Sequence, residues 1–124
     1  MMKEANKIVA EFESFCIKND TAAQASNPNL ANKYAKKIIN CYLQLKEIGK
    51  TNELSKLLKS ENENVRLWAA THTLQTNEVE AKQVLHELAA KPGLNAFSAE
   101  MTLRQWEKGN LKLTYDTYKV KWKG

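Results

Sequence analysis

The sequence is poor in the residues that interrupt helices. It contains four glycines and two prolines among 124 residues. Because both residue types end or kink helices, this scarcity predicts long helices joined by short connections. The glycines are isolated from one another, which excludes a glycine-rich loop of the kind that binds phosphate groups.

Long apolar runs are also missing. No apolar stretch approaches the roughly 20 residues that a helix needs to cross a bilayer. The first residues, MMKEANKIVAEFESF, contain three glutamates and no unbroken apolar segment, so they do not resemble a signal peptide. We therefore expect a cytoplasmic protein that makes no use of a membrane.

Metal ligands and nucleophiles are scarce and widely spaced. Cys16 and Cys41 are 25 residues apart, and His72 and His86 are 14 residues apart. Neither spacing suits a metal site, so we expect buried, reduced thiols, no metal and no cofactor. A pairing of Cys16 with either histidine is open from sequence, but no local motif supports it. The sequence therefore predicts a protein that is not an enzyme.

Apolar residues at three- and four-residue steps predict an all-α domain over residues 1–110. Asn19-Asp20-Thr21 is expected to end the first helix, and Gly49 the second. A different pattern begins at residue 111. In LKLTYDTYKVKWKG, apolar and aromatic residues fall at alternate positions, a period of two. Residues 111–124 are therefore predicted to form a separate, extended or partly paired tail. The predicted helices span about residues 3–18, 30–48, 51–58, 62–75, 77–90 and 95–108.

The helix that contains SENENVRLWAATHTL is apolar on two sides. Val65 and Trp68 fall on one side, and Ala70 and Leu74 fall on nearly the opposite side. The helix over residues 95–108 has the same two-sided character. A helix that is apolar on two faces is expected to be buried on two faces, as in stacked helical layers.

Several stretches resemble known proteins. LLKSENENVRLWAATHTL resembles the signature of a HEAT repeat, and residues 4–110 resemble a family of short bacterial HEAT-like proteins catalogued as a domain of unknown function. The features are IVAEFESFCIKNDTA, NKYAKKI and AFSAEMTLRQWEKGNL. The resemblance implies a right-handed, HEAT-like stack of about six helices and no catalytic activity. Some small bacterial proteins of this general kind act as immunity proteins, which neutralise a secreted toxin.

The net charge of +5 lies at the two ends of the chain. Residues 1–50 carry eight lysines and five acids, residues 51–109 carry seven basic and eight acidic residues, and residues 110–124 carry four lysines and one aspartate. The corresponding net charges are +3, −1 and +3. Basic ends can attract nucleic acid, a membrane surface or an acidic protein, although lysines also simply keep a surface solvated.

We expect a protein-binding module whose partner is another protein, with an immunity or antitoxin role in which it occludes a secreted toxin. The alternative is a HEAT-like module that binds nucleic acid, because aromatic and basic residues alternate in the tail. Arg66 is expected mainly to support the helical layers and secondarily to contact a partner. The candidate partner-binding residues are Arg66, Tyr115, Tyr118, Lys119, Lys121 and Trp122.

Overall fold

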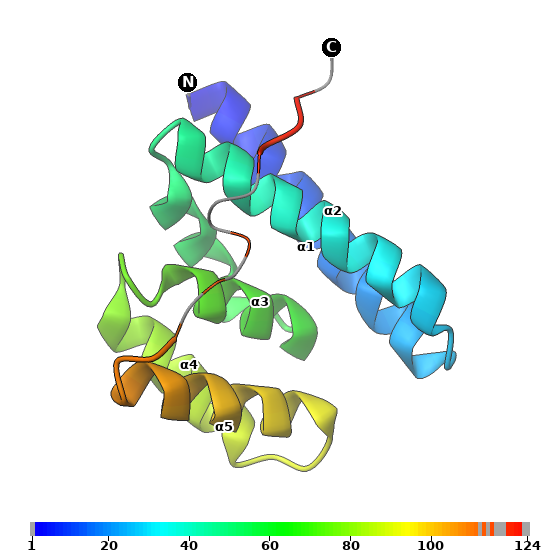
Figure 1. Cartoon of the computed structure of the whole chain (residues 1–124), viewed down its shortest axis with the longest axis vertical. Coiled ribbons are helices and arrows are strands. Elements are labelled where there is room, and N and C mark those ends of the chain that lie inside the picture. Colours follow the sequence, from blue (N-terminus) through cyan, green and yellow to red (C-terminus); the bar gives the residue numbers. More distant parts are fainter. Residues whose placement is uncertain (1, 112, 114, 116–118, 123–124) are drawn as a thin grey trace. The chain divides into compact units, whose positions relative to one another are not determined.

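The chain is described by a computed structural model that covers residues 2–111, 113, 115 and 119–122. These residues form five α-helices and one 3-10 helix, with no strand among them, which confirms the predicted all-α class (Figure 1). The expected extended tail contains no strand in the part described, and Tyr118 lies outside the described residues. The elements are α1 (Met2–Gln24), α2 (Pro28–Glu47), η1 (Thr51–Lys59), α3 (Glu63–Thr73), α4 (Glu78–Ala89) and α5 (Leu94–Glu107).

The helices gather into two compact units, which we describe separately. The first unit comprises residues 1–53 and 115–124, and the second comprises residues 54–114. None of the described helices is both long and apolar enough to cross a membrane.

In the first unit, α1 and α2 form a helical hairpin (Figure 1). Asn27 caps α2, because its side chain accepts a hydrogen bond of 3.2 Å from the N–H of Leu30, and Pro28 fills the first helical position. Phe15 on α1 stacks against Tyr34 on α2, with ring centroids 6.2 Å apart. The buried residues of α1 are Ala5, Ile8, Val9, Phe12, Cys16 and Ala22.

The prediction that α1 ends at residues 19–21 is wrong, because the helix continues to Gln24. Asn19 would otherwise favour a helix end, since its side chain can compete for backbone groups nearby. In the folded chain its side-chain amide instead donates a hydrogen bond of 2.8 Å to the carbonyl of Ala31 on α2. This contact satisfies the side chain across the hairpin and leaves the helix uninterrupted.

The second unit is organised around α3, which packs against both α4 and α5. The side chain of Asn62 caps α3 by accepting a hydrogen bond of 3.0 Å from the N–H of Val65. Val65 and Ala70, which the sequence placed on opposite sides of this helix, are both 0% exposed. The expectation of burial on two faces is therefore confirmed for α3.

Candidate functional site

The described part of the tail contacts α2. The ring of Tyr115 meets the ring of Tyr42 edge-on, with centroids 6.0 Å apart. Lys121 and Trp122 form hydrogen bonds with polar residues of the same helix, and Lys119, Lys121 and Trp122 are all exposed. Three of the predicted partner-binding residues therefore come together on α2.

Arg66, the remaining candidate within the described residues, is on α3 in the second unit. Its side chain is half-buried, and its Nε atom makes no hydrogen bond to any described residue.

Two side-chain amides of α2 bind the main chain of Lys121. Asn40 does so twice, because its Oδ1 accepts a hydrogen bond of 2.9 Å from the Lys121 N–H and its Nδ2 donates one of 3.0 Å to the Lys121 carbonyl. Gln44 donates a third bond, of 2.9 Å, to the same carbonyl. Residues four apart share one face of a helix, so both amides reach the same peptide groups. We call Asn40 and Gln44 the amide clamp.

Trp122 adds a side-chain anchor one turn further along α2. Its indole N–H donates a hydrogen bond of 2.9 Å to Oε2 of Glu47, while 42% of the residue remains exposed. The clamp binds main-chain atoms only, whereas Trp122 is bound through its side chain. No local sequence signal marked Asn40, Gln44 and Glu47, because each of them forms its contact with a segment at least 75 residues away.

A hollow of about 340 Å³ lies beside the clamp, between the tail and the α1–α2 hairpin. Its lining includes three basic residues, Lys36, Lys37 and Lys121, and one acidic residue, Glu11. The Nζ of Lys37 lies 5.6 Å from the centroid of the Phe15 ring, a distance typical of a cation–π contact. The residues that line the hollow are Glu11, Phe15, Lys36, Lys37, Asn40, Cys41, Gln44, Lys121 and Trp122.

The cysteines do not form a reactive centre in the first unit. Cys16 and Cys41 are both buried and neither takes part in a disulfide. Burial raises the pKa of the Cys16 thiol far above its ordinary value, and the nearby Cys41 and Glu13 raise it further. A thiol that stays protonated is a poor nucleophile and a poor metal ligand. Within the described part of the chain, no three His, Cys, Asp or Glu side chains are grouped to hold a metal ion.

A second candidate surface is an apolar stripe on α5. Leu94, Phe97 and Met101 are spaced by three and four residues, so they share one face of the helix. Their exposed fractions are 84%, 66% and 38%. The opposite face carries Ala99 and Leu103, which are buried. We call Leu94, Phe97 and Met101 the α5 stripe.

The α5 stripe corrects an expectation from the sequence. The apolar residues on both sides of residues 95–108 predicted burial on two faces, as in α3. Among the described residues only the side that contains Ala99 and Leu103 is buried, whereas Phe97 on the other side is largely exposed. Periodicity shows which positions are apolar, but it does not show whether a neighbouring element is present to cover them.

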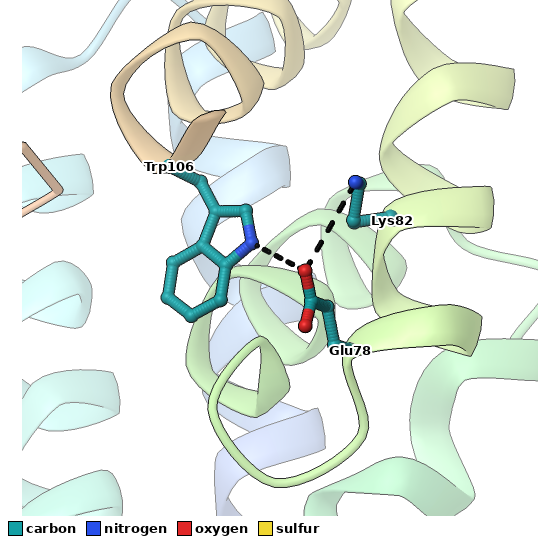
Figure 2. Close-up of polar contacts among 3 residues, drawn as sticks. All are labelled: Glu78, Lys82 and Trp106. Atoms are coloured by element: carbon teal, nitrogen blue, oxygen red, sulfur yellow. Dashed lines mark hydrogen bonds and ion pairs between the residues drawn. The ribbon is translucent and has the colours of Figure 1, made fainter. Parts of the chain in front are cut away.

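Polar contacts hold α5 to α4 at the far end from the exposed Leu94. Figure 2 shows the indole of Trp106, near the end of α5, directed at the carboxylate of Glu78 at the start of α4. Nζ of Lys82 lies 4.0 Å from the same carboxylate oxygen. The bond from Trp106 joins α5 to α4, whereas the contact with Lys82 lies within α4 and holds the Glu78 carboxylate in place.

Comparisons with known proteins agree with this fold. A family model described as "Domain of unknown function (DUF2019)" matches residues 6–107. The crystal structure of the protein RPA1889 from Rhodopseudomonas palustris CGA009 is similar, with a TM-score of 0.82 and 25% sequence identity. The similarity covers 87% of this chain and 92% of that chain. No curated protein matches the sequence significantly.

Proposed function

Since this protein belongs to the DUF2019 family, we propose that it is a non-enzymatic protein-binding module of a HEAT-like helical repeat, whose partner docks on the α5 stripe. The observation that carries the proposal is the exposure of Leu94, Phe97 and Met101 on one face of an ordered helix. Single exposed apolar residues are common on protein surfaces, but a continuous stripe of large side chains is typical of an interface.

The physical argument concerns the outer face of a helical repeat. Terminal helices in repeat proteins usually present a polar outer face, because they have no further repeat to cover them. The outer face of α5 instead presents Phe97 with 66% of its surface exposed. Removing apolar surface from water contributes about 25 cal/mol for each Å² buried, so covering this stripe would favour association. Large apolar side chains on a fixed helix are also the groups that anchor interfaces.

A more specific form of the proposal is an immunity or antitoxin role. The partner would be a secreted bacterial toxin, and binding would cover the toxin's active site. The support for this form is an analogy: the chain resembles a family of short bacterial HEAT-like proteins, and some small bacterial proteins of this general kind act as immunity proteins. It needs no catalytic group on this chain.

Nucleic-acid binding is the second candidate function, and the basic residues of α2 favour it. Lys33, Lys36 and Lys37 lie within one turn and a half of helix and are all exposed. Such a cluster attracts phosphate groups without reading a base sequence. This function would use the first unit, whereas the proposed protein contact uses α5.

The leading proposal is tested with the single variant Phe97→Ser and the matched control Val79→Ser. Val79 is also an apolar residue on a helix of the second unit, and 80% of it is exposed. Tagged proteins are purified from the native host, and the stoichiometry of any bound protein is measured together with the far-UV circular dichroism. The wild type and Val79→Ser are expected to retain the same partner at a fixed ratio, and Phe97→Ser is expected to lose it while remaining helical.

Two outcomes would contradict the proposal. The same partner could be retained at the same ratio by the double variant Leu94→Ser/Phe97→Ser, which would place the contact elsewhere. Alternatively, nucleic acid could copurify in place of protein and be lost when Lys36 and Lys37 are replaced by alanine, which would favour the second candidate function.

A further inference from the structure

Lys121 is held on α2 through its backbone, whereas Tyr115 and Trp122 contact α2 through their side chains. Three hydrogen bonds from the amide clamp meet the N–H and the carbonyl of a single residue, Lys121. Asn40 supplies a donor and an acceptor together, which is the pairing that a strand edge offers to an extended chain. Any extended segment can present the same two main-chain groups, so the clamp is not restricted to this tail.

The charge of the tail does not match the hollow that it borders. Lys121 lines this hollow beside Lys36 and Lys37, whereas Glu11 is the single carboxylate in the lining. Like charges around the same hollow oppose binding, and one carboxylate cannot neutralise three lysines. Covalent attachment gives the tail a high effective concentration at the clamp, and this offsets the unfavourable charge.

We propose that the amide clamp and its hollow form a binding site for an extended, acidic segment of a partner protein, and that the tail occupies this site when the partner is absent. An acidic residue at the position of Lys121 would face Lys36 and Lys37 with the opposite charge. An aromatic N–H in the next position would keep the hydrogen bond to Glu47. This site adds a second contact to the proposed function and does not depend on the α5 stripe.

The probe for this proposal is a pair of synthetic peptides added to the full-length protein. The first peptide has the tail sequence YDTYKVKWKG (residues 115–124). The second has glutamate in place of Lys119, Lys121 and Lys123. The protein contains three tryptophans, so its NMR spectrum has three indole N–H signals, and Trp122→Phe identifies the signal of Trp122. This signal reports directly whether the tail is on or off α2.

The acidic peptide is expected to shift the Trp122 signal to the position of an unfolded chain. It should do so at a concentration about tenfold lower than the native-sequence peptide requires, because it replaces like-charge contacts with opposite-charge contacts. The same charge reversal can be made in the full-length chain. Lys121→Glu should hold the tail more tightly on α2, so hydrogen exchange at the amide of residue 121 should slow by a similar factor. Equal displacement by both peptides, or by neither, would overturn the proposal.

The clamp itself is tested by direct binding of the fluorescently labelled acidic peptide. Asn40→Ala should weaken this binding about tenfold or more, whereas the matched control Asn32→Ala, at an exposed position of α2 outside the hollow, should not change it. Both substitutions favour helix, so far-UV circular dichroism should stay constant. Unchanged peptide binding by Asn40→Ala would overturn the proposal, and so would displacement of the tail by a single-stranded oligonucleotide but not by the acidic peptide.

Discussion

The indole N–H of Trp106 donates a hydrogen bond of 3.0 Å to Oε2 of Glu78, a residue 28 positions earlier in the chain (Figure 2). The bond joins the C-terminal turn of α5 to the first turn of α4, and the carboxylate also lies favourably at the N-terminus of α4. It therefore links the start and the end of a helical hairpin, and the orientation of the α5 stripe depends on that link.

Replacing Trp106 with phenylalanine keeps an aromatic ring but removes the indole N–H. We expect the free energy of unfolding to fall by about 1 kcal/mol, the usual effect of losing one hydrogen bond. Urea denaturation measures this change. Trp122→Phe is the matched control, because it removes an indole–carboxylate bond of 2.9 Å from a residue that is 42% exposed, and it should cost less. A larger loss in the control than in Trp106→Phe would contradict the role assigned to Glu78.

Ala70 tests the burial of α3 on both faces. Its side chain is 0% exposed, so Ala70→Glu places a carboxylate in a close helix contact without a partner. We expect the melting temperature, followed by circular dichroism, to fall by more than about 10 °C or the chain to be unfolded at 25 °C. Ala10→Glu, at an exposed position of α1, is the control and should leave the melting temperature nearly unchanged. Equal melting temperatures for the two variants would rule out the buried α3.

The ion pair between Glu63 and Lys91 predicts a pH dependence of stability. Nζ of Lys91 lies 2.8 Å from Oε2 of Glu63, and this hydrogen bond is the main cause that lowers the pKa of the Glu63 carboxyl. A lowered pKa in the folded state stabilises the protein fully above the ordinary glutamate pKa of about 4.3, and this stabilisation is lost as the pH falls through the lowered value.

Lys91→Met should therefore destabilise the chain at pH 7 by no more than about 1 kcal/mol, because both side chains are substantially exposed. The difference from the wild type should shrink as the pH falls below the ordinary glutamate pKa and through the lowered value, as measured by urea denaturation at each pH. A difference that persisted unchanged in acid would show that Lys91 acts through packing and not through its charge.

Oligonucleotide binding separates the two candidate functions. If the leading proposal is correct, generic single-stranded DNA should bind no more tightly than about 10⁻⁶ M at physiological salt, the range of non-specific electrostatic binding. Fluorescence anisotropy over a salt series measures this affinity. Lys36→Ala/Lys37→Ala should reduce the slope of log affinity against log salt by about 1.4, since two phosphate contacts to a single strand would be lost. Nanomolar affinity at physiological salt would favour nucleic-acid binding over the protein contact.

The sequence predicted those features that depend on local periodicity and capping. Gly49 marked the end of α2, which extends to Glu47, and Val65 and Ala70 marked the two buried faces of α3. In both cases the signal lies within a few turns of one helix, where side-chain spacing determines which residues share a face. The all-helical class followed from this pattern repeated along the chain.

The sequence could not predict contacts whose partners are far away in the chain. Asn40 resembles any polar residue on a helix surface, and its role depends on the peptide groups of Lys121, 81 residues later. Asn19 has the side chain of a helix terminator, yet its contact with Ala31 keeps it inside α1. The α5 stripe was missed for a related reason, since its apolar pattern is the same whether or not another element covers it.

The burial of both native thiols makes the protein a convenient background for site-specific chemical labelling. Cys16 is 0% exposed and Cys41 is 3% exposed, so maleimide reagents should modify neither thiol while the chain is folded. A cysteine introduced at the exposed position of Lys119 would then carry a single spectroscopic probe on the tail without prior removal of the natural ones. Movement of the tail on α2 can thus be followed in a chain that differs from the native sequence at one position.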